Sequence, residues 1–216
     1  MPWQVTPKTI DMSPYVAILV AAFLGVVAGH PGGHGKCSAN LTLTVDECCK
    51  IPLLANETVV DSCKKQFPFK HEHGKDGEGQ HAKGHRAGAC LAGCILNALG
   101  GFKDDSLDTA GFKKSLGQVF KTSTTEMSQL LRQSIDECAA QVAVDPAFLR
   151  NSGQKSDNAP ACNIIPMLFM NCLYGRVFEK CPRSEWNNRK ECTALKDKLK
   201  GGCPYFALRK HPKREN

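Results

Sequence analysis

The chain has 216 residues, a net charge of +7 and twelve cysteines. Its length and its many Leu, Ile, Val and Phe residues suffice for a sizeable hydrophobic core, which excludes a scaffold in which disulfides replace the core. Part of the positive charge lies in the C-terminal tail, residues 209–216, where no aromatic side chains alternate with the charges for base stacking. We therefore predict a mobile basic end and no nucleic-acid partner.

The N-terminus has the pattern of a secretory signal peptide. An apolar run covers residues 15–28, Lys8 lies upstream, and the small residues Ala28 and Gly29 mark a cleavage point. A retained membrane anchor is the alternative, but the run is short for a span and Gly, His and Pro residues follow it at once. We predict a signal at residues 1–29, a secreted single domain at residues 30–216 and no membrane span. All twelve cysteines follow the signal, and an even number in that context predicts disulfides formed in an oxidising compartment.

The first helices are expected at residues 46–51 and 56–66. Pro52 would end the first helix, and Asn56 could cap the second. Asn40 and Asn56 also begin Asn-x-Thr triplets, the acceptor pattern for N-glycosylation, and their occupancy stays open.

Residues 68–88 are rich in Gly, His and charge and contain almost no large apolar side chain. Such a segment cannot bury enough surface to offset its ordering entropy, so we predict a mobile loop.

A zinc or copper site is the alternative for this segment, because two histidines lie two positions apart and two more lie four apart: His71, His73, His81 and His85. We predict no metal there, since no cysteine or carboxylate has a matching spacing. If the loop covered a binding site, protonation of these histidines below about pH 6.5 would loosen the ligand.

Two helices follow this loop. Residues 87–99 place Cys90 and Cys94 on one face, and Gly100-Gly101 would end the helix. The Cys-x3-Cys spacing would also suit a metal, but bridges to two neighbouring segments are favoured in a chain with ten other cysteines. Residues 108–120 repeat apolar side chains at helical spacing.

The clearest amphipathic helix starts at Ser123, which forms a capping-box pattern with Glu126. It ends at Asp145-Pro146, after which residues 146–150 could form a short helical turn and residues 151–160 a polar loop. Its apolar stripe predicts a core-facing side made of Met127, Leu131, Ile135, Cys138 and Val142.

The most apolar stretch after residue 29 covers residues 162–182 and carries no charge before Arg176. A helix that is apolar on every face is buried, and this one is too short to cross a bilayer. We therefore predict a central helix of a soluble protein, stopped by Pro182, with its three cysteines pointing in separate directions. A last helix is expected from a cap at Ser184 to about Leu199.

No period-two strand pattern persists. The predicted fold class is all-α, a single compact domain of six to eight helices cross-linked by about six disulfides around an apolar cavity.

The spacing of the cysteines carries more specific information. Four cysteines, Cys63, Cys90, Cys94 and Cys138, follow one another with 26, 3 and 43 residues between them. Eight residues separate Cys172 from Cys181. This pattern resembles the six-cysteine core of the insect odorant-binding proteins, in which the first cysteine pairs with the third, the second with the fifth and the fourth with the sixth. Cys162, the proline directly after Cys181 and the added C-terminal cysteines resemble the Plus-C subgroup. The resemblance covers nearly the whole mature chain.

The resemblance implies the bridges Cys63–Cys94, Cys90–Cys172 and Cys138–Cys181. Fifteen pairings remain for the other six cysteines: Cys37, Cys48, Cys49, Cys162, Cys192 and Cys203. A bridge between adjacent cysteines forces a strained ring, because their Cα atoms are only about 3.8 Å apart. We therefore expect Cys48 and Cys49 to have different partners, with Cys162, Cys192 and Cys203 as the candidates.

The resemblance further implies a secreted carrier that binds small hydrophobic odorant or pheromone-like molecules in an internal cavity and transports them through extracellular fluid, without a cofactor. A sensory-neuron receptor or a second copy of the chain would be further partners. The candidate ligand-binding residues, for each of which plain core packing is the alternative, are Phe120, Met127, Leu131, Ile135, Met167, Leu168, Phe169 and Phe178. Tyr174 could offer its hydroxyl to a polar ligand head.

Two other non-enzymatic functions stay open, namely a scavenger of amines or lipids on a related fold and a His-rich metal-binding protein. Enzymatic functions fit poorly. A Cys-Cys pair is typical of phospholipase A2, but Lys50-Ile51-Pro52 stands where that chemistry needs a histidine and an aspartate. The chain has no Gly-x-Ser-x-Gly or His-Glu-x-x-His pattern, and bridged cysteines provide no nucleophile.

Overall fold

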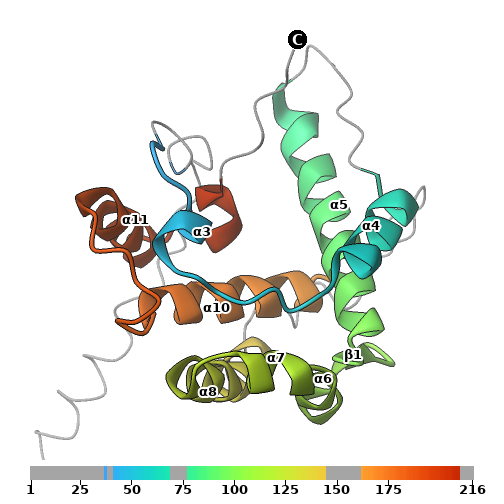
Figure 1. Ribbon diagram of the computed structural model, residues 1–216. Coiled ribbons are helices and arrows are strands. Elements are labelled where there is room, and N and C mark those ends of the chain that lie inside the picture. Colours follow the sequence, from blue (N-terminus) through green and yellow to red (C-terminus); the bar gives the residue numbers. More distant parts are fainter. Residues whose placement is uncertain (1–36, 38–40, 69–76, 145–161, 210–216) are drawn as a thin grey trace, which may run out of the picture. The chain divides into compact units, whose positions relative to one another are not determined.

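The protein is described by a computed structural model, which covers residues 37, 41–68, 77–144 and 162–209 (Figure 1). The predicted signal, Asn40, the helical turn at 146–150, the polar loop at 151–160 and the tail from 210 lie outside the described residues. The described residues form eight α-helices, one 3-10 helix and a two-stranded hairpin, which confirms the all-α prediction. No described helix is long and apolar enough to cross a membrane.

The first two described helices, α3 (Val45–Cys48) and α4 (Glu57–Gln66), lie close to where the sequence predicts them. Thr44 caps α3 in a capping box with Glu47. Asn56 caps α4, because its side-chain oxygen accepts a hydrogen bond from Val59 N at 2.8 Å. The predicted role of Asn56 as a helix cap is confirmed.

Helix α5 (Gly77–Ala98) begins ten residues before its predicted start. The second half of the predicted loop is therefore helical, while residues 69–76 lie outside the described residues. Glu78, Gln80, Ala82 and Lys83 are good helix formers, and extending a helix that is already nucleated costs little. The helix ends as predicted, since Gly100 adopts a φ of 64° and Gly101 N donates to Leu96 O at 2.8 Å.

A hairpin follows, formed by β1 (Phe102–Lys103) and β2 (Ser106–Leu107), although the sequence predicts no strand. Phe102 pairs with Leu107 and Lys103 with Ser106. Two residues per strand are too few to produce a period-two pattern. The turn residues Asp104 and Asp105 have φ values of 49° and 59°, the left-handed region in which Gly and Asn are more common.

The helix predicted at 108–120 is two helices, α6 (Thr109–Ser115) and α7 (Gly117–Thr122). Helix α8 (Thr125–Ala143) is capped by Thr124, whose hydroxyl accepts from Met127 N, and the prediction of Ser123 as the cap is wrong. Ser123 instead donates its hydroxyl hydrogen to Val119 O at 2.7 Å, at the end of α7. All five residues of the predicted stripe on α8 are buried.

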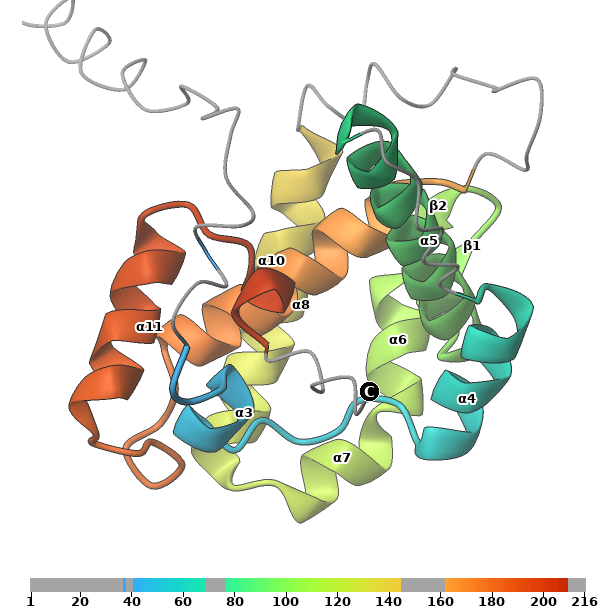
Figure 2. The ribbon, with the colours of Figure 1, turned by 90° about the horizontal axis from the view of Figure 1, so that it is seen from above.

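Helix α10 (Ile165–Glu179) is the predicted central helix. It packs against α5, α8, α11 (Lys190–Lys200) and the 3-10 helix η1 (Tyr205–Leu208) (Figures 1 and 2). Phe169, Leu173, Val177 and Phe178 are almost completely buried in the core that these elements share. The apolar character of this stretch therefore predicted its place in the fold correctly.

Helix α11 starts at Lys190, so the prediction that Ser184 caps it is wrong. The segment before α11 makes backbone hydrogen bonds to the segment after α3 instead. Lys50 N donates to Glu185 O at 3.2 Å, and Asn187 N donates to Cys48 O at 2.8 Å. These bonds form an isolated antiparallel bridge between Cys49 and Trp186, and the helix begins only after this bridge.

All twelve cysteines are disulfide-bonded. The predicted bridge Cys63–Cys94 is confirmed, whereas the predicted bridges Cys90–Cys172 and Cys138–Cys181 are wrong. The other five bridges are Cys37–Cys203, Cys48–Cys192, Cys49–Cys181, Cys90–Cys162 and Cys138–Cys172. Cys48 and Cys49 have different partners, as expected, and Cys192, the partner of Cys48, is one of the three candidates. Cys49 pairs with Cys181, which was not a candidate, because Cys162 belongs to the core set in place of Cys181.

The distance along α10 explains the corrected pairing. Ten helical residues span about 15 Å, so cysteines before, within and after this helix meet different neighbours. Cys162 lies at the end near α5 and reaches Cys90, and Cys172 faces Cys138 on α8. Cys181 lies beyond the other end of α10 and reaches Cys49, next to α3.

Candidate functional site

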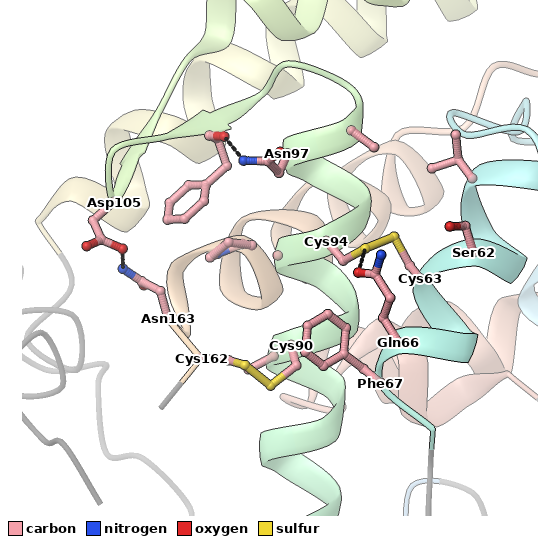
Figure 3. Close-up of a pocket in the computed structure, with 16 residues that line it drawn as sticks. Ser62, Cys63, Gln66, Phe67, Cys90, Cys94, Asn97, Asp105, Cys162 and Asn163 are labelled. Carbon is pink, nitrogen blue, oxygen red and sulfur yellow. Dashed lines mark hydrogen bonds between the residues drawn. A yellow bond between two sulfur atoms is a disulfide. The ribbon is translucent and has the colours of Figure 1, made fainter. Parts of the chain in front are cut away.

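An open groove of about 560 Å³ lies between α4, α5, the hairpin and the start of α10 (Figure 3). Its volume is in the range of small-molecule sites in proteins. Most of the lining is apolar or sulfur-containing, and its apolar side chains are those of Val59, Phe67, Ala89, Ala98, Phe102 and Pro166. The polar lining side chains are Ser62, Gln66, Asn97, Asp105 and Asn163.

Two disulfides form part of this lining. Cys63–Cys94 joins α4 to α5, and Cys90–Cys162 joins α5 to the residues before α10. Figure 3 shows both bridges, with Asp105 and Asn163 on one side of the groove and Ser62 and Cys63 on the other. Because the bridges fix the spacing of three elements, the groove is formed before any ligand arrives, and binding does not have to order its walls.

Hydrogen bonds fix the polar side of the groove. Asn163 accepts from Ile165 N at 2.9 Å and donates to Asp105 Oδ1 at 3.2 Å. Asn97 donates to Phe102 O at 3.1 Å, which attaches the hairpin to α5. The Gln66 amide lies 3.5 Å from Cys94 Sγ. A disulfide sulfur carries no proton, so this contact is a packing contact and not a hydrogen bond.

The eight candidate ligand-binding residues come together, but elsewhere in the fold. Six are buried in the common core: Phe120, Met127, Leu131, Ile135, Phe169 and Phe178. Leu168 is half-buried and packs against that core, and Met167 faces α5, with its sulfur 3.5 Å from where a Cβ at Gly88 would lie. None of the eight lines the groove, and their role in ligand binding stays a prediction.

The sequence did not single out the aromatic residues of the groove. Phe67 lies directly after α4, and Phe102 opens the hairpin, where strand alternation puts it on the face opposite to Lys103. A signal for both exists in hindsight. Each residue comes shortly after a helix that carries a bridged cysteine. A side chain at the end of such a helix has a fixed position and can therefore form a wall of a binding site.

Tyr174 lies in an aromatic cluster outside the groove. Its ring stacks on Tyr205 with 5.3 Å between centroids and meets Phe206 edge to face. Burial of the hydroxyl raises the pKa of Tyr174 to about 12. The Tyr205 hydroxyl donates to Asp46, which Arg209 also holds through an ion pair of 3.0 Å. This cluster attaches the C-terminal 3-10 helix to α3 and α10.

Within the part of the chain that the structure describes, no group of three His, Cys, Asp or Glu side chains is placed to hold a metal ion. The four histidines of the metal hypothesis are not among the described side chains. That hypothesis, and the pH-dependent gate with it, stays a prediction.

Comparison with known proteins gives the family. Residues 52–198 match the AgamOBP47-like family. The chain belongs to this family of odorant-binding proteins. It is also 39% identical over 205 residues to General odorant-binding protein 67 of Anopheles gambiae, covering 93% of this chain and 96% of that protein. Odorant-binding protein 47 of the same mosquito is 21% identical over 171 residues, covering 74% and 69% of the two chains.

The disulfides agree with this membership. The twelve cysteines form six bridges, which fits the Plus-C type of odorant-binding protein. With Cys162 and Cys172 as the fifth and sixth core cysteines, the three core bridges follow the expected order of first with third, second with fifth and fourth with sixth. The resemblance was thus to the right family, with two cysteines assigned to the wrong places.

Proposed function

We propose that the protein is a secreted carrier that binds small hydrophobic molecules and transports them through extracellular fluid, with no chemical step. The observation that carries the proposal is the groove between α4, α5 and α10, whose walls two disulfides hold apart. Membership of an odorant-binding family supports odorants as the class of ligand. The signal-like N-terminus and the six disulfides support secretion.

The energetics of such a site suit a carrier. Burial of apolar ligand surface contributes about 25 cal/mol per Å², and a ligand in a groove of this size can bury a few hundred Å². After the cost of association, a Kd in the micromolar range, about −8 kcal/mol, is reasonable without a charged partner. Affinity of this order lets a carrier load in fluid and release its ligand at a target.

A displacement titration tests this function. The uncharged fluorophore N-phenyl-1-naphthylamine should bind the purified protein with a micromolar Kd, and small apolar molecules should displace it below about 100 μM. The proposed function is wrong if neither the fluorophore nor a panel of apolar odorants binds in that range.

Two phenylalanines provide a matched test of the place of binding. Phe67→Ala removes an aromatic wall of the groove, and Phe206→Ala removes a similarly half-buried ring from the cluster around Tyr205. Loss of about 50 Å² of contact should weaken binding about eightfold for Phe67→Ala, while Phe206→Ala should bind normally. If Leu168→Ala weakens binding and Phe67→Ala does not, the ligand lies in the core instead, as the eight candidate residues predict.

A further inference from the structure

We propose that the groove selects molecules with an apolar body and a protonated amine at one end, and that Asp105 receives the amine. This inference rests on the proposed function and adds the class of ligand to it. The Asp105 carboxylate lies at the polar side of the groove, opposite walls that are mostly apolar.

The Asp105 carboxylate has a fixed place at the polar side of the groove. Residues 104 and 105 form the two-residue turn of the hairpin, and the pairing of Lys103 with Ser106 closes that turn. Asn163 donates to one carboxylate oxygen at 3.2 Å, which leaves the second oxygen with its full capacity to accept. Asn163 itself is held by Ile165 N at the start of α10. The hairpin and α10 together therefore position this one carboxylate.

Asp105 is the one ionised group among the sixteen described residues that line the groove. The bridged cysteines do not titrate, and the other polar lining residues are an alcohol or amides. The nearest basic residue along the hairpin, Lys103, belongs to the opposite face of β1 from Phe102. The chain as a whole carries +7, so the groove presents a local negative charge on a basic protein. An ammonium group is attracted here, and a carboxylate is repelled.

The apolar wall suits the other end of such a molecule. Phe67, Phe102 and the two disulfides offer ring and sulfur surface to an alkyl or aromatic body. Asp105 is exposed, so water screens the attraction and most of the affinity comes from this apolar contact. The carboxylate therefore contributes more to the difference in affinity between ligands of equal size than to the affinity itself.

Three molecules of equal length test the proposal: octylamine, 1-octanol and octanoate, each as a competitor of N-phenyl-1-naphthylamine at pH 7 and low salt. The full mature chain should bind octylamine about two- to fivefold more tightly than 1-octanol, the size of effect that an exposed ion pair gives. Octanoate should bind more weakly than 1-octanol. The preference for the amine should fall in 0.5 M NaCl, where charges are screened over a few Å, and 1-octanol binding should not fall with it.

Asp105→Asn removes the charge and keeps an oxygen for Asn163, and Asn tolerates the left-handed backbone of this turn at least as well as Asp. This variant should bind octylamine and 1-octanol equally, because its affinity for octylamine falls more than its affinity for 1-octanol. Asp104→Asn is the control, because Asp104 shares the turn and its conformation but does not line the groove. It should keep the preference of the native chain, and unfolding curves should verify that both variants fold.

The outcomes separate the two proposals. Equal binding of octylamine and 1-octanol by the native chain, or equal losses in Asp104→Asn and Asp105→Asn, overturns the role of Asp105 and leaves the carrier function standing. Failure of all three molecules and of the fluorophore to bind overturns both.

Discussion

At the scale of single residues, the Glu137 carboxylate on α8 contacts a neighbour on its own helix and two basic residues at the C-terminal end of α10. Gln133 donates to its Oε1 at 2.7 Å, and Arg176 on α10 donates to its Oε2. Lys180 lies 3.6 Å from the same oxygen. The hydrogen bond from Gln133 and the charges of Lys180 and Arg176 outweigh burial and lower the pKa of the Glu137 carboxyl.

We expect Glu137→Gln to lower the urea midpoint of unfolding at pH 7. A lowered folded pKa means that the contribution of Glu137 is fully present above its unfolded value of about 4.3 and is lost as the pH falls through the folded value. The difference between the native chain and this variant should therefore shrink from pH 7 to pH 3. Glu179→Gln removes an exposed carboxylate from the end of α10 and is the control for the change in net charge. A constant difference at every pH would contradict the assignment.

Helix caps show how far single residues can be predicted from the sequence. Asn56 was identified correctly because no competing cap residue precedes α4. Ser123 and Thr124 are both suitable caps, and the choice depends on where α7 ends, since the Ser123 hydroxyl bonds to Val119 O. Ser184 also has a cap-forming side chain, but the bonds of residues 185–187 to the chain around Cys48 decide the local backbone. Sequence patterns do not show such distant partners.

At the scale of elements, the corner between α5, the hairpin and α6 is held by close packing of backbone. A Cβ at Gly111 would overlap the carbonyl oxygen of Gly100 and lie 2.7 Å from Asp108 Oδ2. Asp108 is the cap of α6 and cannot move without losing its bond to Gly111 N. A Cβ at Gly117, at the start of α7, would meet nothing within 4 Å.

These two glycines should respond to alanine in opposite ways. Gly111→Ala should destabilise the fold by about 1–3 kcal/mol, since the backbone must shift to make room. Gly117→Ala should stabilise it by about 0.4–1 kcal/mol, because alanine lowers the entropy of the unfolded chain and fits the helix. Urea unfolding with the disulfides intact measures both. Similar effects of the two substitutions would show that the corner is not closely packed.

Helices are predicted best where the apolar residues within the helix itself recur with a strong pattern. Helix α10 and the stripe of α8 follow from apolar periodicity, because burial decides their faces. The bridges of α10 were harder, since Cys162, Cys172 and Cys181 give two similar sets of gaps and spacing alone does not choose between them. The groove was missed for a related reason. Its walls come from four segments that meet only in the folded chain, and the longest apolar runs mark the core rather than the site.

For the whole molecule, the nesting of the disulfides matters more than their separation in the sequence. Cys37–Cys203 spans 166 residues, and Cys48–Cys192 lies within it and spans 144. Once the inner bridge is formed, the outer bridge closes a loop made only of the remaining 22 residues, which lie on either side of the inner bridge. The chain-entropy relation gives about 5 kcal/mol for a 166-residue loop but about 3 kcal/mol for the remaining one. Most of the loop entropy is already removed by the inner bridge.

We expect the double variant Cys37→Ser, Cys203→Ser to lose about 3 kcal/mol in guanidinium unfolding, with unchanged far-UV circular dichroism and unchanged ligand affinity. The comparison is Cys63→Ser, Cys94→Ser, whose bridge spans only 31 residues and has no bridge nested within it. That variant should lose a similar amount, about 3–4 kcal/mol, by the same relation and should also loosen the groove, since both cysteines line it. The two losses should thus be nearly equal, although the first bridge spans 166 residues and the second only 31. A loss near 5 kcal/mol for the outer pair would instead mean that the N-terminal and C-terminal segments are closed independently of Cys48–Cys192.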